Sequence, residues 1–590
     1  MSSPGLPTHL DGFPASDGIA LGRVRRVDWR VPEAPRATVR RGARRRELDR
    51  LEEALRRARA ELEEIKGRTE ARLGTVEARI FDPQILMLED PEVVEGTKRY
   101  ISENRVTAAR AFEWRMLELT ELWARTSHTM VLDRLNDLHD VKLRVLGRLL
   151  GLPSPWDLED AVDAVIVARD LTPSFVARLD PERASGLATD TGSRAAHWAI
   201  LARSMEIPAV VGLGDVFDRT RDGQTIIVDG RSGHVVIDPG EVEAQRFEQR
   251  RTRISGWTRR VPEGVPAAAV TLDDAAVTLR ANLDLPGEAR RARELGAQGV
   301  GLFRTEFLAV GRRAGPGEEE QYRAYSAVAE TFPSDAVLIR IFDLGGDKFP
   351  LFLRMPAEGN PFLGRRGVRV CRDEPGLFLT QLRAILRATV HGDVRVMVPL
   401  VNTTEELAAF RELLGAAKEQ LQGEGVPFRD DVKVGAMIET PAAALAAAEL
   451  AAASDFLSIG TNDLVQYALA VDRTNTGLAH LFDPFHPAVP RLVAQVAEAG
   501  RSAGIEVSAC GEMAAQPAGA VLLAGLGVDS LSVAWPSLPE ITNLIRGSRM
   551  RDMCEAAAAA VGASGSADLR RALERPLAGP PDQGLSSRDP

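Results

Sequence analysis

The sequence predicts a multidomain α/β protein, in which an α/β domain interrupted by a helical bundle is followed by a (β/α)8 barrel of the TIM type. The chain has 590 residues, enough for roughly four domain equivalents, or fewer if one is a large barrel. A long segment with helical spacing separates two β-rich segments of the N-terminal half. Eight strand-like runs alternate with helical runs in the C-terminal half.

The composition restricts the classes of protein to consider. Lys+Arg is 74 against Asp+Glu 84, a net charge of -10, so the chain lacks the basic footprint of a nucleic-acid binder. No apolar stretch approaches about 18 residues and the N-terminus has no signal-peptide pattern, so we expect no membrane insertion. Three widely spaced cysteines, Cys371, Cys510 and Cys554, fit neither a disulfide framework nor a zinc site. We therefore expect a soluble, cytoplasmic protein.

Residues 1–39 and 152–237 are predicted to form one discontinuous α/β domain. The segment GIALGRVRRV at 18–27 alternates like a strand. From residue 162, short β-branched runs lie between turns and end in the hairpin TIIVDGRSGHVVIDP. Pairing the early strand with these runs makes the segment between them an insertion.

The insertion, residues 40–151, is predicted to be a helical hairpin or bundle. Its apolar residues recur at spacings of three and four, which is the pattern of a helical seam: Leu48, Leu51, Leu55, Ala58, Leu62 and Ile65. The charges of residues 40–66 favour a solvated helix face over an interaction surface.

Residues 238–268 are predicted to be a linker, charged and helical at first and then broken by Pro262 and Pro266. The barrel is assigned to residues 269–560 from eight β-then-α units. Its strand-like runs are 277–283, 299–304, 337–344, 394–401, 432–438, 456–460, 505–510 and 530–534. Residues 561–590 are expected to be a frayed C-terminal tail.

Polar residues follow the barrel strands, where the catalytic groups of such barrels lie. They are Asn282, Arg304-Thr305-Glu306, Arg340 with Asp343, Glu439, Thr461-Asn462-Asp463 and Cys510-Gly511-Glu512. Arginine forks suit a phosphate or carboxylate, and one or two carboxylates suit Mg²⁺. Ordinary salt bridges of the barrel rim are the alternative for any single residue. They explain the whole set less well, because burying so many polar groups without a ligand costs stability.

Two further segments favour a phosphate-bearing ligand. GGDK contains Lys348, one of only six lysines, and NPFLGRRGVR contains Arg366. His197 follows a turn at the start of an amphipathic helix, where backbone N–H groups and the helix dipole can receive an anion. A histidine there could carry a phosphoryl group, although a structural role is the commoner one for a single histidine.

From about residue 17 to about residue 550 the chain resembles enzyme I of the phosphoenolpyruvate-dependent phosphotransferase system. The motifs that carry the resemblance are DLTPS (170–174), GSRAAHWAILARSMEIPAVVG (192–212), GVGLFRTEFL (299–308), FDLGGDK (342–348), NPFLG (360–364), GAMIETPAA (435–443), SIGTNDLVQYALAVDR (458–473) and CGEM (510–513). The family's order implies a swivelling phosphohistidine α/β domain, whose helical insertion docks a small HPr-like carrier protein. A phosphoenolpyruvate-binding barrel that forms a homodimer follows.

The resemblance implies a role for each matching residue. His197 would be the phosphoryl acceptor, Cys510 the general acid, and Glu439 and Asp463 the Mg²⁺ ligands. The ligands of phosphoenolpyruvate would be Arg304, Arg340, Lys348, Arg366, Asn462 and Arg473. A thiol, with an ordinary pKa of about 8.5, is protonated at neutral pH and can give its proton to the enolate that phosphoryl loss leaves.

The chain departs from the family beside the histidine. Family members usually have GGRTSH where this chain has GSRAAH, with Ser193, Ala195 and Ala196, and Val176 replaces a threonine. Hydroxyl groups there can hold a ring nitrogen or contact phosphate, so we expect His197 to be less firmly oriented and its phosphorylation to be slower or altered.

Two alternatives stay open, and only the first is motivated by these departures. One is a regulatory paralogue that senses phosphoenolpyruvate without efficient transfer. The other, less expected, is a relative of phosphoenolpyruvate synthase or pyruvate phosphate dikinase, for which the sequence leaves no room for an ATP-grasp domain.

The helical insertion offers candidates for the carrier-docking surface. Phe81, Leu86 and Met87 are the apolar candidates, and Asp137 and Asp140 are expected to support helix packing. An amphipathic core explains the three apolar residues equally well.

Overall fold

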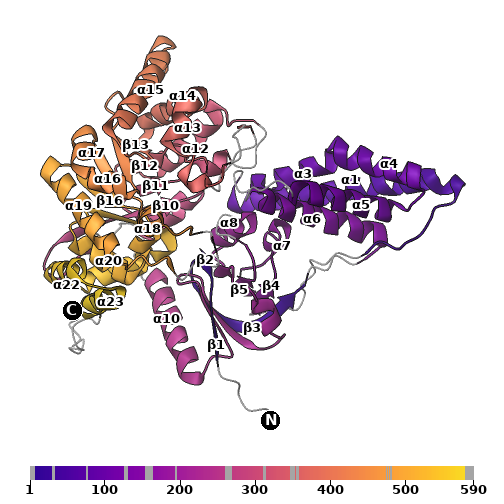
Figure 1. The fold of residues 1–590 in the computed structure, drawn as a ribbon, viewed down its shortest axis with the longest axis horizontal. Coiled ribbons are helices and arrows are strands. Elements are labelled where there is room, and N and C mark those ends of the chain that lie inside the picture. The colour runs from indigo at the N-terminus through magenta and orange to yellow at the C-terminus, as the bar shows by residue number, and fades with distance from the viewer. Residues whose placement is uncertain are drawn as a thin grey trace. The chain divides into compact units, whose positions relative to one another are not determined.

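The computed structural model describes residues 7–28, 33–74, 78–124, 130–152, 164–181, 183–192, 196–259, 269–309, 314–345, 352–353, 358–473, 475, 478 and 481–577. The chain divides into two compact units, Met1–Arg253 and Ile254–Pro590 (Figure 1). Each unit has hydrophobic clusters of its own.

The N-terminal unit is built on an eight-stranded mixed sheet with the order β1-β8-β7-β3-β4-β5-β6-β2. The strands are β1 (Thr8–Asp11), β2 (Phe13–Ser16), β3 (Ile19–Val27), β4 (Ala164–Ala168), β5 (Ala184–Thr189), β6 (Ala209–Val211), β7 (Thr225–Asp229) and β8 (His234–Ile237). β3 pairs in parallel with β4 and antiparallel with β7. This pairing joins the early strand to the strands after the insertion, as the sequence predicts.

Close contacts at Gly12 and Gly233 let the two edge strands of this sheet, β1 and β2, follow each other directly in sequence. β1 and β2 lie at opposite edges of the sheet, yet only Gly12 separates them in sequence. A Cβ atom on Gly12 would lie 2.5 Å from the Val211 carbonyl oxygen, and one on Gly233 would lie 2.4 Å from the Gly12 carbonyl oxygen. Side chains at either position would therefore push the two edges apart.

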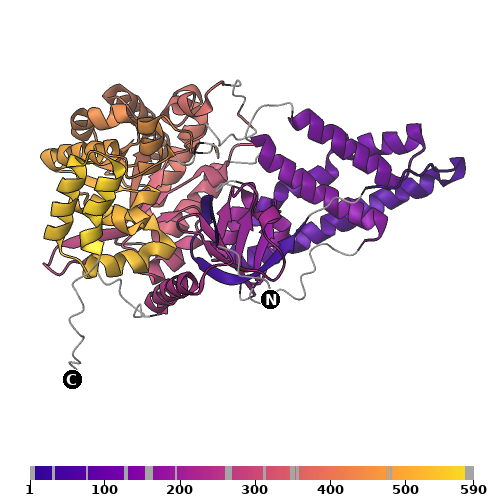
Figure 2. The same cartoon turned by 60° about the horizontal axis from the view of Figure 1, so that its bottom comes forward.

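The insertion is a bundle of helices that extends from the sheet (Figures 1 and 2). Its helices are α1 (Arg44–Leu73), α3 (Asp82–Glu89), α4 (Pro91–Asn104), α5 (Ala108–Ala124) and α6 (Met130–Leu150). The residues of α1 expected on its apolar seam from Leu51 to Ile65 are buried in the bundle core, because spacings of three and four place them on one helix face.

Three short helices complete the N-terminal unit: α7 (Pro173–Val176), α8 (His197–Ser204) and α9 (Val216–Arg219). A longer helix, α10 (Glu241–Arg259), begins in this unit and continues past its boundary at Arg253. Trp198 and Leu201 of α8 belong to the same hydrophobic cluster as the helical bundle. α8 therefore packs into the core that joins the sheet to the insertion. Helix α10 occupies much of the segment assigned to a linker, and Pro262 and Pro266 lie outside the described residues.

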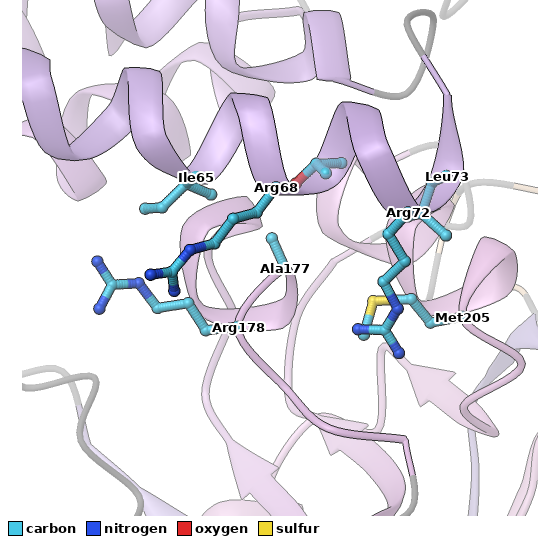
Figure 3. Close-up of a pocket in the computed structure, with 8 residues that line it drawn as sticks. Ile65, Arg68, Arg72, Leu73, Ala177, Arg178 and Met205 are labelled. Carbon is cyan, nitrogen blue, oxygen red and sulfur yellow. The ribbon is translucent and has the colours of Figure 1, made fainter.

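A pocket of about 230 Å³ lies between α1 and the ends of α7 and α8 (Figure 3). Apolar side chains line part of it, and the guanidinium groups of Arg68, Arg72 and Arg178 line the rest. The arginines are already engaged: Arg68 donates to Glu64, Arg178 to Glu61, and Arg72 to the Leu179 carbonyl oxygen. The pocket is thus part of the seam between the insertion and the α/β domain.

The C-terminal unit contains the eight-stranded parallel barrel that the sequence predicts. Its strands are β10 (Ala276–Leu283), β11 (Val300–Phe303), β12 (Ala336–Arg340), β13 (Asp393–Val398), β14 (Val434–Ile438), β15 (Phe456–Ile459), β16 (Glu506–Ala509) and β17 (Ser530–Ala534), with β9 (Ala269–Val270) antiparallel to β10. Each of the eight overlaps one predicted run. β10 pairs with both β11 and β17, which closes the barrel.

Helices alternate with these strands and surround the barrel. They are α11 (Glu288–Glu294), α12 (Glu318–Thr331), α13 (Val368–Asp373), α14 (Pro375–Ala388), α15 (Thr404–Gly423), α16 (Pro441–Leu445), α17 (Ala447–Ala453), α18 (Thr461–Leu469), α19 (Ala488–Ala503), α20 (Pro517–Gly525), α21 (Leu538–Arg546), α22 (Met550–Gly562) and α23 (Ser566–Leu577).

Helix α23 corrects the expectation of a frayed tail from residue 561. Leu569 and Leu573, four residues apart, are fully buried in the hydrophobic cluster of the barrel unit. The helix forms because this pair reaches the core, although the residues around it are mostly polar or small. Within the part of the chain that is described, no helix is long and apolar enough to cross a membrane.

Candidate active site

The expected barrel residues that the structure describes follow the carboxyl ends of the strands. Arg304 comes directly after β11, Arg340 ends β12, Glu439 follows β14 and Cys510 follows β16. Asn462 and Asp463 lie in the first turn of α18, after β15. Because parallel strands end at the same rim of a barrel, these side chains share one mouth. Lys348 lies outside the described residues.

Arg340 is buried and firmly held at this mouth. Its Nη2 donates to Glu306 Oε1 at 2.7 Å, and its Nη1 lies 3.3 Å from Asp343 Oδ2. Burial alone would lower the pKa of Arg340, but these carboxylates outweigh it and raise the pKa. Its buried Nε has no hydrogen-bond partner among the described residues. A buried donor left unpaired costs free energy, so an anionic ligand would satisfy it.

Arg304 supplies a second positive charge close by. Its Nη1 donates to Asp284 Oδ1 at 2.7 Å. Burial and the neighbouring Arg340 both oppose its charge, but Asp284 outweighs them and raises the pKa of Arg304. Two guanidinium groups near enough to repel each other favour a multiply charged anion between them.

Arg366 is the most buried of the expected arginines that the structure describes, with 1% of its surface exposed, and it pairs with two carboxylates. Its Nε and Nη2 donate to the two oxygens of Asp343 at 2.9 and 2.8 Å. Its Nη1 and Nη2 donate to the two oxygens of Asp463 at 3.1 and 2.9 Å. Arg473 reaches the same Asp463 at 3.8 Å. The Arg366 guanidinium therefore holds in place two carboxylates, Asp343 and Asp463, that follow different barrel strands.

Glu439 and Asp463 have the chemistry expected of Mg²⁺ ligands. Both are buried, and Glu439 Oε1 accepts the backbone N–H of Leu400 at 2.7 Å. Burial, Asp463 and Asp343 raise the pKa of Glu439 well above its usual range. This excess of buried negative charge fits a divalent cation, which would lower that pKa. Among the described residues no group of three or more His, Cys, Asp or Glu could hold a metal, but Mg²⁺ usually takes one or two carboxylates and completes its shell with water and phosphate oxygens.

Cys510 is a buried thiol in polar surroundings. Ser458 Oγ donates to its Sγ at 3.4 Å, and Sγ lies 3.7 Å from the Ile459 carbonyl oxygen. Burial raises the pKa of the thiol, and the charges of Glu439, Arg340 and Arg304 act on it. The thiol is therefore protonated at neutral pH, and it lies close enough to these charged residues to interact with them electrostatically.

Two amides support this thiol and its neighbours. Asn282, predicted to lie at a strand end but not in the site, donates to the Cys510 carbonyl oxygen at 3.0 Å and accepts from Ser532 Oγ at 2.7 Å. Asn462 donates to Glu512 Oε1 at 3.2 Å and accepts the Glu512 backbone N–H at 2.9 Å. Three carboxylates also bind these site residues: Asp284, Glu306 and Glu512. The sequence places Glu306 and Glu512 at strand ends without a role, and it indicates Asp284 only by its place directly after a strand.

His197 is the first residue of α8, as expected from the sequence. Its side chain is 18% exposed, and its Nδ1 lies 3.7 Å from Oδ2 of Asp137 on α6. Val176 is buried in α7 and Ala196 precedes the helix without a side-chain cap. Ser193 and Ala195 lie outside the described residues. Asp137, expected to support helix packing, thus faces the candidate phosphoryl acceptor.

The apolar docking candidates separate into two groups. Phe81 is fully buried and Met87 is buried in the bundle core, so these two are core residues and not an exposed patch. Leu86 is 48% exposed and stays a docking candidate. The helix buries one face of this segment and exposes the other, and a continuous run of apolar residues does not predict which side chains lie on which face.

Comparison with known proteins gives one consistent result over nearly the whole chain. Models of the PEP-utilising enzymes match three segments: the N-terminal domain at residues 11–131, the mobile domain at 161–233 and the PEP-binding domain at 260–550. The solution NMR structure of the protein Enzyme I (nEIt) is 32% identical and covers 42% of this chain and 99% of its own, with a TM-score of 0.35.

Two curated relatives extend over most of the chain. The phosphoenolpyruvate-protein phosphotransferase of Geobacillus stearothermophilus is 40% identical over 529 residues, which are 90% of this chain and 91% of the relative. The protein of the same name from Staphylococcus epidermidis is 38% identical over 94% of this chain and 96% of its own. The chain therefore belongs to the phosphoenolpyruvate-protein phosphotransferase family.

Proposed function

We propose that this protein transfers the phosphoryl group of phosphoenolpyruvate to its own His197 and then to a histidine of an HPr-like carrier protein. The observation that carries the proposal is the barrel mouth, where the buried Nε of Arg340, without a hydrogen-bond partner among the residues described, lies near Arg304 and a protonated Cys510. The family's name and its PEP-binding model over the barrel support the same substrate. Neither alternative, the regulatory paralogue or the synthase relative, is favoured by these comparisons.

The residues of the mouth suit phosphoryl loss from phosphoenolpyruvate. The bond between phosphorus and the enol oxygen breaks while a bond from phosphorus to an imidazole nitrogen forms. Charge spreads over the phosphoryl oxygens in the transition state, so preorganised guanidinium groups stabilise it. The enolate left behind takes the Cys510 proton on carbon and becomes pyruvate.

Each expected ligand has a distinct part in this proposal. Arg304 and Arg340, with Lys348 outside the described residues, would hold the anion. Arg366 would fix Asp343 and Asp463 while presenting charge to the ligand, and Asn462 and Arg473 would complete the contacts. Glu439 and Asp463 would hold Mg²⁺, which when bound neutralises charge on the phosphate oxygens.

The phosphorylated His197 must then meet the carrier. The segment that carries His197 matches the model of a mobile domain, which supports a domain that moves between donor and acceptor. Docking of the carrier on the helical insertion, dimerisation through the barrel and a cytoplasmic location are proposed from the family resemblance.

Mass spectrometry of the protein after incubation with phosphoenolpyruvate and Mg²⁺ tests the proposal. We expect the wild type to gain one phosphoryl group on His197 and to release pyruvate, and His197→Ala to gain none. Adding an HPr-like carrier should discharge the wild type and phosphorylate the carrier. Binding of phosphoenolpyruvate without a phosphohistidine would contradict the proposal and favour the regulatory alternative.

A further inference from the structure

We propose that Asp137 is a positioning residue for His197: its carboxylate selects the tautomer of the imidazole and stabilises the ring once it is phosphorylated. The inference rests on the proposed function, in which His197 accepts the phosphoryl group. It assigns to the helical insertion a part in the phosphohistidine site itself.

A buried chain of polar side chains leads to the imidazole. Ser174 Oγ donates to Gln84 Oε1 at 3.3 Å, and Gln84 Nε2 donates to Asp137 Oδ1 at 3.0 Å. The other carboxylate oxygen, Asp137 Oδ2, lies 3.7 Å from His197 Nδ1. Ser174 and Gln84 are completely buried and Asp137 is 1% exposed. The amide therefore fixes one oxygen of the carboxylate and turns the other toward the ring.

The distance and the burial together indicate a functional contact. At 3.7 Å the pair is within ion-pair range and longer than a direct hydrogen bond, and catalytic hydrogen bonds are often long before the reacting complex forms. A buried carboxylate is costly unless a positive or hydrogen-bonding partner compensates it. Gln84 is neutral, so the His197 ring is a partner that can compensate the charge of Asp137.

The chemistry of the transfer gives this contact its effect. A carboxylate beside Nδ1 favours the tautomer with the proton on Nδ1, which leaves the lone pair on Nε2 for the attack on phosphorus. When the P–N bond forms, the ring keeps the Nδ1 proton and becomes cationic. Asp137 then faces a positive ring in a buried setting, where the attraction is stronger than in water.

The contact also offers a replacement for the missing hydroxyl groups. Val176 stands where the family usually has threonine, and a valine cannot hold a ring nitrogen. In this chain Asp137 and Gln84 come from the insertion, whereas Ser174 and His197 come from the α/β domain. The packing of the insertion on the α/β domain therefore sets the position of the carboxylate.

The test compares full-length wild type, Asp137→Asn and Asp140→Asn for the rate of His197 phosphorylation from phosphoenolpyruvate and Mg²⁺. Asp140 is the matched control, because it is a buried aspartate of the same helix that pairs with Arg144 at 3.2 Å. We expect Asp137→Asn to slow phosphorylation by about tenfold or more, as for other groups that orient a histidine ring, and Asp140→Asn to change it by less than about threefold. Equal rates for wild type and Asp137→Asn would overturn the inference.

A second readout is independent of turnover and of any variant's stability. Nitrogen NMR of the wild-type imidazole, with the His197 signals assigned by their loss in His197→Gln, should show the Nδ1–H tautomer. A predominant Nε2–H tautomer would overturn the inference. Gln84→Leu, which removes the amide that fixes Asp137, should also slow phosphorylation. If the wild type forms no phosphohistidine at all, the proposed function fails, whereas a normal phosphohistidine with no Asp137 effect refutes only the positioning role.

Discussion

The three cysteines occupy three different environments, and only one environment suits acid catalysis. Cys371 is buried among apolar groups, and burial raises its pKa to about 12. Cys554 is exposed on α22. Cys510 is buried too, but it accepts a hydrogen bond from Ser458 and lies within the field of Arg340 and Arg304. Burial raises the pKa of this thiol and keeps it protonated, and the charged groups lie where the proposed general acid would act.

Replacing Cys510 by alanine should reduce pyruvate formation by about 10²- to 10⁴-fold, the usual contribution of a positioned general acid. Phosphoenolpyruvate binding should change little, because the arginines remain. Pyruvate release measured in steady state checks the first point, and calorimetric titration checks the second. Cys371→Ala is the matched control: it should lower thermal stability without changing turnover. Equal losses of turnover in both variants would contradict the assignment.

Arg366→Lys should destabilise the barrel unit, because lysine cannot donate to two carboxylates at once. Breaking buried pairs of this kind costs about 3–5 kcal/mol, so its unfolding midpoint should fall clearly. The neighbouring Arg365→Lys is the control: Arg365 pairs with Asp373 near the surface, where such pairs contribute about 0–1 kcal/mol. Similar midpoints for the two variants in denaturant unfolding would show that the buried network is not essential to the barrel.

At the residue scale, the sequence predicts positions better than partners. The strand ends locate Arg340, Glu439 and Cys510 because parallel strands share a rim. The hydrogen bonds of Arg366 to Asp343 and Asp463 join residues up to 97 positions apart, and no local pattern predicts which carboxylates a guanidinium selects. The approach of Asp137 to His197 depends on how α6 packs on α8, so it too required the structure.

At the scale of elements, one carboxylate of α1, that of Glu61, pairs with arginines from α6 and from the turn after α7. Glu61 of α1 forms an ion pair with Arg144 at 2.6 Å and accepts a hydrogen bond from Arg148 at 2.5 Å, both on α6, and it also pairs with Arg178. Burial would raise the pKa of Glu61, but the three arginines outweigh it and lower the pKa to about 2. This cluster ties the insertion to the α/β domain.

Glu61→Gln should therefore destabilise the N-terminal unit in a pH-dependent way. A depressed folded-state pKa stabilises the fold above the unfolded pKa of about 4.5 and loses that effect as pH falls through about 2. The difference between wild type and variant, of order 3 kcal/mol at pH 7, should shrink between about pH 4.5 and 2. Denaturant unfolding across this range is the measurement. A difference that stays constant with pH would show that the pairing does not hold Glu61 ionised.

Helix α23 shows why element prediction failed at the C-terminus. The eight strands are visible in the sequence as short, mostly apolar runs between helical segments. Helix α23 contributes only Leu569 and Leu573 to the core, in a segment otherwise rich in charge and alanine. A pair at a spacing of four is too weak a signal without knowledge of the surface it meets.

Leu569→Ala should cost the barrel unit about 2–5 kcal/mol, the usual range for a fully buried leucine. Leu526→Ala, at a partly buried leucine of the same unit, should cost less. Truncation after Gly562 should lower the unfolding midpoint, because it removes α23. A shortened chain that ends at Gly562 and keeps wild-type stability would restore the tail interpretation.

On the scale of the whole molecule, the two units have separate interiors. The clusters of the sheet and helical bundle use residues before 238, and the barrel clusters use residues from 269 onward. Among the described residues no hydrophobic cluster spans both units. In the proposed transfer from the barrel mouth to His197 and then to a carrier, the histidine would visit two partners, and independent cores permit this without unfolding either unit.

Calorimetry of the whole chain should accordingly show two transitions that respond independently. Glu61→Gln should lower only the transition of the N-terminal unit, and Leu569→Ala only that of the barrel. The double variant should be additive within about 0.5 kcal/mol, because the two sites share no partner. In a His197→Ala background, which removes the proposed phosphoryl acceptor, phosphoenolpyruvate with Mg²⁺ at about 100 times its Kd should stabilise the barrel transition alone by about 2.7 kcal/mol. A single cooperative transition, or a ligand effect on both, would mean that the units are coupled, and the histidine would then have to reach the barrel by a motion of smaller range.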